Sequence, residues 1–275
     1  MPAPKELDPS KSLAALYGKK LRKLRVRAGW TQRELGDQIP LAHSRIAQFE
    51  LGKEVPPKDI SDRLDKLLDA DGDLSDLWEH VKRAPYSDWV RKYVEYEARA
   101  TAMHKYLPFH VPDLLQTEAY AREVMRAARP WFTADEIEEK VAARLARRVV
   151  LEKAEPPLLW VVLDEAVLRR PVGGPSVMRE QLAYVLEASS SLHVEVQVLP
   201  FEVGAHAAMG GTLTLLSFDN SPDVAYVEGE SWGDLVRDRR AVARHSHRYD
   251  LVQASALSPG ASVNWVAKAM EEFAA

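Results

Sequence analysis

The chain has no cysteine among its 275 residues, so neither a disulfide framework nor a thiolate metal site can form. Long hydrophobic runs are missing too. Residues 158–163, among the longest, fall far short of the roughly 18 apolar residues that a membrane-spanning helix needs. Residues 1–6 lack the apolar stretch of a signal peptide. We therefore expect a cytoplasmic protein with no membrane partner, no metal and no cofactor.

Phosphate-binding motifs are also absent, because the sequence contains no Walker-type loop and no Gly-x-Gly-x-x-Gly. Some side chains could still suggest an active site, namely Asp164, Glu165, His206, Glu228, Glu230, His245 and His247. Asp164 and Glu165 follow a predicted strand, where capping the next helix is the simpler interpretation. His245 and His247 are two residues apart on a predicted helix, where side chains diverge. We expect no enzymatic activity, with an enzyme domain tethered to DNA as an alternative.

Charge is unevenly divided along the chain. Residues 1–58 hold 12 Lys and Arg against 6 Asp and Glu, whereas residues 59–275 hold 25 against 35. Residues 11–30 alone contain seven basic side chains and no acidic one. A basic end on an acidic protein is typical of a nucleic-acid-binding module, although a solvated basic helix face would give the same count.

The basic region predicts a long helix followed by two short ones joined by a tight turn. Apolar residues spaced three and four apart indicate a helix over residues 12–28, and Gly29 is a natural end for it. Thr31 followed by Glu34 forms a capping box, which begins the second helix. That helix must end at Pro40, whose ring cannot continue it.

The third helix, which begins near Ala42, carries the residues best suited to read DNA. Ile46 and Phe49 are expected to be buried, so polar side chains face outward. A helix of this kind enters the major groove with its N-terminal end, and Gln48 can hydrogen-bond an adenine edge. The start of the second helix and a lysine in the following turn would hold phosphates. The predicted DNA contacts are Gln32, Arg33, His43, Ser44, Arg45, Gln48 and Lys53.

These residues carry a resemblance to a known family. Residues 31–32, 34–35, 46, 50, 52 and 56–57 resemble the repressor-type helix-turn-helix group called xenobiotic-response-element (XRE) or Cro/cI-like. The resemblance implies that Glu50 helps to lock the fold, that Gly52 turns the chain and that His43, Ser44 and Gln48 read bases. Pro40 departs from the Gly or small polar residue usual at its position. We expect a homodimer that places two such helices in successive major grooves of a pseudo-palindromic operator in double-stranded DNA.

Two further helices complete an expected N-terminal DNA-binding domain of residues 1–85. They cover residues 59–68 and 74–83. Residues 71–73 between them are a turn rather than part of a calcium loop, because the remaining ligand positions do not fit. Residues 86–275 form the second expected domain. Its first element is a long linker helix, predicted from Ser87 to about Tyr106.

The second domain is predicted to place helices around a small mixed sheet. The expected helices cover residues 118–128, 134–153, 176–188, 238–256 and 258–274, and the expected strands residues 158–163, 193–199, 211–218 and 224–228. Arg144, Arg147 and Arg148 are expected as a solvated surface cluster paired with nearby glutamates, with a site for a phosphate or acidic ligand as the alternative. Valines alternate with Glu195 and Gln197, which indicates a strand with one solvent-facing side. The fold class is therefore an α-dominated α+β protein with a five-helix repressor-type N-terminal domain.

Five segments of this second domain resemble another family. They are residues 96–100, 111–117, 144–148, 163–169 and 198–201. The family is the domain of unknown function that follows a helix-turn-helix in antitoxin-like regulators of filamentous actinobacteria. The resemblance implies a transcription factor of development or secondary metabolism. Its gene is often paired with one for a small partner protein that relieves DNA binding, and no catalytic residues come with the resemblance.

Two modes of control remain open. A small acidic or apolar partner protein could dock on the C-terminal domain, or a small-molecule effector could fill a pocket in it. An exposed apolar patch favours the first and an enclosed apolar cavity the second. The candidate segment is the glycine-bounded loop 201–211, which contains His206 and Met209. We expect a sequence-specific transcription regulator that dimerises through its C-terminal domain and senses a partner protein, with a small-molecule-responsive repressor as the alternative.

Overall fold

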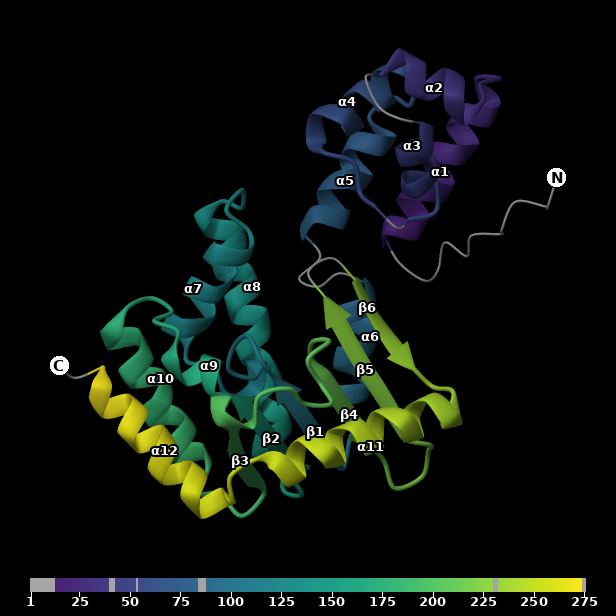
Figure 1. Ribbon diagram of the computed structural model, residues 1–275. Coiled ribbons are helices and arrows are strands. Elements are labelled where there is room, and N and C mark those ends of the chain that lie inside the picture. The colour runs from purple at the N-terminus through teal and green to yellow at the C-terminus, as the bar shows by residue number, and fades with distance from the viewer. Residues whose placement is uncertain (1–12, 40–42, 53, 84–87, 230–231, 274–275) are drawn as a thin grey trace. The chain divides into compact units, whose positions relative to one another are not determined.

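The computed structural model describes residues 13–39, 43–52, 54–83, 88–229 and 232–273. The chain divides into two compact units, Met1–Asp88 and Trp89–Ala275, whose elements are labelled in Figure 1. None of the helices within these described ranges is long and apolar enough to cross a lipid bilayer.

The described part of the N-terminal unit consists of five helices around one apolar core. They are α1 (Leu13–Arg27), α2 (Gln32–Gln38), α3 (His43–Glu50), α4 (Lys58–Leu67) and α5 (Asp73–Arg83). Tyr17, Leu35, Phe49 and Leu64 each bury their side chain in this core, one from each of the first four helices. The predicted helix-turn-helix pair and the two helices that follow it are confirmed.

Local signals set the ends of these helices. Gly29 follows α1 with a φ of 76°, a conformation that glycine adopts without steric cost. Both halves of the predicted capping box are present, since the Glu34 amide donates to Thr31 Oγ1 at 3.1 Å and the Thr31 amide donates to Glu34 Oε2 at 2.7 Å. Asp65 of α4 is 7% exposed and accepts hydrogen bonds from the amides of Gly72 (2.9 Å) and Leu74 (2.8 Å), which ties α4 to the start of α5.

The C-terminal unit is built on a six-stranded mixed sheet with the order β3-β2-β1-β4-β5-β6. The strands β1 (Ala102–Leu107), β2 (Leu158–Asp164) and β3 (Val194–Leu199) are parallel. The strands β4 (Leu213–Ser217), β5 (Val224–Gly229) and β6 (Trp232–Val236) continue antiparallel from β1. The expected α+β class is therefore correct, with four of the six strands predicted.

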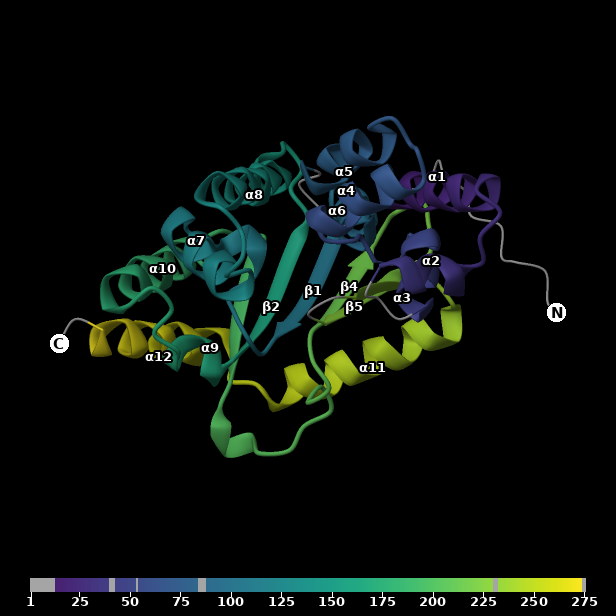
Figure 2. The same cartoon turned by 90° about the horizontal axis from the view of Figure 1, so that it is seen from above.

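Helices cover both faces of this sheet (Figure 2). One face packs against α6 (Asp88–Glu97), α7 (Glu118–Ala128), α9 (Glu165–Arg169), α10 (Pro175–Ala188) and α12 (Pro259–Glu272). The helix α8 (Ala134–Ala146) packs on α7 and adds a small satellite core. The opposite face packs against α11 (Arg239–Ser255). Short 3-10 turns complete the unit: η2 (Asp113–Leu115), η3 (Arg147–Glu152) and η4 (Phe201–Val203).

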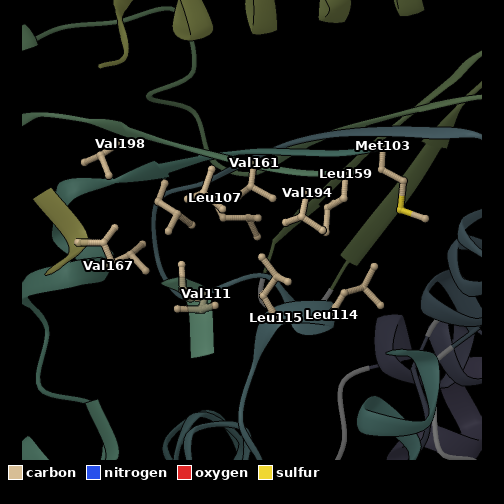
Figure 3. Packing of buried hydrophobic residues seen from close by; sticks show 14 of the residues in the cluster. Met103, Leu107, Val111, Leu114, Leu115, Leu159, Val161, Val167, Val194 and Val198 are labelled. Atoms are coloured by element: carbon tan, nitrogen blue, oxygen red, sulfur yellow. The ribbon is translucent and has the colours of Figure 1, made fainter. Parts of the chain in front are cut away.

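The larger core lies between the parallel strands and the segments that connect them (Figure 3). Side chains of β1, β2 and β3 point to one face and meet those of η2 and α9. The residues labelled there are Met103, Leu107, Val111, Leu114, Leu115, Leu159, Val161, Val167, Val194 and Val198, and all are buried.

The predicted helix from Ser87 to Tyr106 is wrong in its second half. The helix α6 ends at Glu97, and residues 102–107 form β1, the strand between β2 and β4. Met103 is buried on one face of β1 and Tyr106 on the other. A strand covered on both sides does not show the apolar and polar alternation of a half-exposed strand. Its pairing partners are also distant in sequence, so no local pattern distinguished it from a helix.

The expected solvent-facing side of β3 is also wrong at Gln197, which is 6% exposed. Its Oε1 accepts from Trp160 Nε1 at 2.7 Å, and its Nε2 donates to the carbonyl of Leu257 at 2.7 Å. The α11–α12 connection further covers the outer edge of β3. The Leu257 amide donates to the carbonyl of Val198 at 2.9 Å, and the Val198 amide donates to Ser262 Oγ at 3.0 Å.

A buried group of charged side chains connects α6, β1, η2 and η3. Glu97 is 2% exposed and pairs with Lys105 Nζ at 2.9 Å and with Arg147 Nη2 at 2.7 Å. Through Nη1, Arg147 also reaches Asp113 at 2.8 Å, and Asp113 meets Arg144 at 3.3 Å. The expectation of a solvated arginine cluster is therefore wrong, because two of its members lie in this network.

Burial alone would raise the pKa of the Glu97 carboxyl, but the charges of Lys105 and Arg147 outweigh it and hold that pKa below its ordinary value. The folded protein therefore binds this proton less readily than the unfolded chain does. Such a group stabilises the fold above its unfolded-state pKa, about 4.3 for glutamate. The stabilisation is lost as the pH falls through the depressed pKa of the folded state.

We expect Glu97→Gln to lower the free energy of unfolding by about 3–5 kcal/mol at pH 7, because it leaves Lys105 buried without its counter-charge and removes one of the two carboxylates that pair with Arg147. Urea unfolding measures this loss, which should shrink as the pH falls through the depressed pKa of Glu97. Glu95→Gln removes an exposed carboxylate from the same helix and should change the free energy by less than about 0.5 kcal/mol. Equal losses in the two variants would contradict this role of Glu97.

Candidate nucleic-acid interface

One fully buried carboxylate fastens α3 to the rest of the N-terminal unit. Glu50 is the last residue of α3 and is 0% exposed. It accepts from Arg25 Nη2 of α1 at 3.1 Å and from Gln32 Nε2 of α2 at 2.7 Å. Arg22 Nε of α1 adds a longer contact at 3.4 Å. The implied role of Glu50 in locking the fold is confirmed, because its side chain joins three helices.

Glycines let the backbone of α1 approach the end of α3. A Cβ on Gly18 would lie 2.4 Å from a backbone carbonyl oxygen of α3, and one on Gly52 would lie 2.8 Å from the Cα of Ala15. The φ of Gly52 is 63°, so the implied turn at this residue is confirmed. The buried face of α1 therefore runs through Ala15 and Gly18. Leu13 and Leu16, which were expected in the apolar stripe, are 38% and 40% exposed instead.

The outward side of α3 presents polar groups to solvent. Ile46 and Phe49 are fully buried, as predicted, whereas Gln48 is only partly buried. His43 and Ser44 form the first turn of the helix, but their side chains lie outside the described residues. The other predicted contact of this region, Lys53, also lies outside them, as does the unusual Pro40.

Arg45, a predicted DNA contact, is held by an acidic neighbour. Its Nε donates to Glu54 Oε1 at 3.1 Å, and its guanidinium carbon lies 5.5 Å from the centre of the Phe49 ring. The Arg45 side chain is 42% exposed, so a ligand can still reach it. The sequence analysis missed Glu54. The signal that could have found it is its position, since Glu54 is an acidic residue just after the turn at Gly52, which brings the chain back toward α3.

The start of α2 holds the two remaining predicted contacts. Gln32 uses one amide hydrogen on Glu50, and the same nitrogen carries a second hydrogen that can be donated outward. Arg33 is exposed on the same turn of α2. Gln32 therefore connects the buried carboxylate of α3 with the surface at the N-terminus of α2, where backbone amides favour anions.

Part of the basic sequence of α1 serves the fold rather than the surface. Lys20 pairs with Asp73 of α5 at 2.6 Å, and Arg27 donates to the carbonyl of Asp69 at 2.9 Å. With Arg22 and Arg25 bound to Glu50, the fully exposed basic residues of this helix include Lys19 and Lys23. The charge count alone therefore overstates the cationic surface of α1.

The carboxylates that suggested chemistry in the C-terminal unit have structural partners. Asp164 accepts the Ala166 amide at 2.9 Å at the start of α9, so its predicted capping role is confirmed. Its other oxygen accepts from the Tyr106 hydroxyl at 3.1 Å. Glu165 is 8% exposed and accepts the Phe201 amide at 3.0 Å. Within the described ranges, no group of three or more His, Cys, Asp and Glu side chains could hold a metal ion.

Residues 229–233 fit the Gly-x-Ser-x-Gly pattern of a nucleophile elbow, so it was wrong to exclude this motif from the sequence. An elbow of that kind connects a strand to a helix. Here Gly229 pairs with Trp232, and the segment joins the antiparallel strands β5 and β6. The two ends of the pattern therefore lie on paired antiparallel strands rather than on a strand and a helix. Its serine, Ser231, is outside the described residues.

Comparisons with protein families give two matches. Residues 16–78 match the family described as "Helix-turn-helix domain", and residues 90–268 match the family described as "Domain of unknown function (DUF5753)". Comparison with curated proteins and with solved structures found no match. The helix-turn-helix match agrees with the geometry of α2 and α3 and makes the protein a DNA-binding regulator. Because the second match covers more than half of the chain, the protein belongs to the DUF5753 family, with a helix-turn-helix domain in front of the family domain.

Proposed function

We propose that the protein is an XRE-type transcription regulator that reads a specific operator through α3. The observation that carries this proposal is the anchoring of α3 at Glu50, which leaves the opposite side of the helix open to a ligand. Gln48 would read an adenine edge, and His43, Ser44 and Arg45 would meet guanine or a phosphate. Gln32, Arg33 and Lys53 would hold the phosphate backbone. A protein of this kind works where the chromosome is, in the cytoplasm.

Gln48→Ala should weaken operator binding by about 1–3 kcal/mol and relax the preference at one base pair, because it removes a base contact. Arg33→Ala is the matched control, since a phosphate contact carries no sequence information and its loss should weaken all duplexes alike. Binding of a panel of duplexes with single base changes separates the two effects. An unchanged base preference in Gln48→Ala would show that Gln48 does not contact a base.

We assign dimerisation to the C-terminal unit, so that two copies of α3 meet a pseudo-palindromic site. The N-terminal unit has its own core around Leu35 and Leu64 and so supports tests on a fragment. Residues 1–85 alone should remain mostly monomeric and bind a single half-site weakly. Sedimentation and binding isotherms measure both properties. A fragment that dimerises and binds as tightly as the full chain would place the dimer contact in the N-terminal unit instead.

A small partner protein that docks on the C-terminal unit is the favoured signal. Phe201 and Met209 support this choice because they are 58% and 70% exposed and lie in one loop between β3 and β4. If the two side chains form one patch, that patch would suit a protein partner. Asp164 and Glu165 already have structural partners, which supports a regulatory rather than a catalytic role for the same region.

In vitro selection of bound DNA, repeated with the protein of the neighbouring reading frame, tests this control. The neighbouring protein should cause the unchanged regulator to dissociate from its operator. In the double variant Phe201→Ser, Met209→Ser, the amount of that protein needed for dissociation should rise by about tenfold or more, while the affinity for DNA stays the same. The exposed Leu192→Ser serves as a control for loss of an apolar side chain elsewhere. Release by a small-molecule extract but not by the protein would favour the effector hypothesis.

A further inference from the structure

One segment of the C-terminal unit has the opposite charge to its surroundings. Residues 237–248 hold five arginines and one aspartate, whereas the rest of residues 89–275 hold 16 Lys and Arg against 25 Asp and Glu. The segment follows β6 and includes the first ten residues of α11, the helix on the face of the sheet opposite α7 and α10 (Figure 2). It therefore creates a local positive potential on an acidic unit.

Three of these arginines form a row along α11. Arg240, Arg244 and Arg248 are spaced four residues apart, so they lie on the same side of the helix, about 6 Å apart along its axis. All three side chains are exposed. The helix turns other residues toward the sheet, and its buried positions are Val242, Tyr249 and Val252. We call these three residues the α11 arginine row.

The arginines of the segment have no acidic partner among the described residues. Among the residues that the structure describes, none of the five forms an ion pair with a carboxylate. The aspartate of the segment, Asp238, uses its side chain to cap α11 through the Ala241 amide at 2.9 Å. Arg248 donates one N–H to the carbonyl of Ala207 at 3.1 Å and keeps further donors. By contrast, Arg122 on α7 pairs with two glutamates.

A neighbouring histidine responds to this excess of positive charge. His245 lies half-buried on α11, between Arg244 and Arg248 in sequence. Burial lowers its pKa, and the charges of Arg248 and Arg244 lower it further, against the opposing charge of Asp234. The charges of these two arginines thus reach the surface of α11 around His245.

We propose that the α11 arginine row is a second DNA-contacting surface, which holds backbone phosphates while α3 reads bases. The inference rests on the proposed DNA-reading function. Guanidinium groups match phosphate oxygens in geometry and charge. Among the described residues of α11, the one large apolar side chain that is exposed is Leu251, at 47%, beyond the C-terminal end of the row, and none lies between the three arginines. Protein interfaces centre on such side chains, so this surface fits a nucleic acid better than an acidic protein.

The test removes the charge of the row from the full-length protein. The variant R240Q/R244Q/R248Q is tested on a duplex that the unchanged protein selects. The slope of the logarithm of its binding constant against the logarithm of the salt concentration should be shallower by about 0.9 for each lost phosphate contact. Three lost contacts mean that, between 50 and 200 mM salt, the parent loses roughly 40-fold more affinity than the variant does. Base preference should not change, because phosphate contacts do not read sequence.

Two further variants make the result specific. R170Q/R179Q/K268Q removes the same charge from exposed sites of the same unit and should keep the parental slope. R240K/R244K/R248K keeps the charge of the row and should restore most of the slope. If R240Q/R244Q/R248Q has the same salt-dependence slope as the unchanged protein, the inference is overturned. This holds also if the variant loses a response to an acidic protein, because the row would then bind protein rather than DNA. Failure of the unchanged parent to bind any duplex would overturn the proposed function itself, and the inference with it.

Discussion

The position of α3 depends on the carboxylate of Glu50, which has no solvent exposure and receives donors from two other helices. A helix of eight residues is too short to be stable alone, so its orientation must come from tertiary contacts. Apolar packing through Ile46 and Phe49 turns one side of α3 toward the core. The charge-assisted hydrogen bonds of Glu50 are directional and add a second constraint on the orientation of the helix. The described part of the outer face of α3, with Arg45 and Gln48, is therefore held in one orientation, which the proposed reading of base pairs requires.

The C-terminal unit uses a second buried carboxylate in a similar way. Glu97 at the end of α6 receives Lys105 from β1 and Arg147 from η3, three elements that the chain visits at widely separated points. Replacing such a group with apolar residues is often neutral in stability, so its value lies elsewhere. A shift of β1 by one residue would place Lys105 on the face toward α11 and leave Glu97 without this partner. We infer that the pair selects the register of β1 among alternatives that apolar packing alone would accept.

Sequence patterns predicted the N-terminal unit well because its signals are local. Thr31 with Glu34 and the stop at Gly29 act within one turn of helix, and the structure has all three as expected. The same patterns failed where distant partners decide the outcome. Residues 102–107 form a strand because they pair with β2 and β4. Arg147 is buried because it forms an ion pair with Glu97, which is 50 residues earlier in the chain. The pairing of Arg45 with Glu54 was missed for a smaller reason, since a turn brings them together and helix periodicity does not extend across a turn.

The outer edge of β3 is covered by the Leu257 amide and the Ser262 hydroxyl, both of which lie C-terminal to all six strands. During synthesis the sheet can therefore be complete while one border still displays unsatisfied backbone donors and acceptors. An open border of this kind recruits foreign chains by strand addition. Leu257 and the first turn of α12 close this border once the C-terminal residues have folded, and they thereby remove a site for self-association.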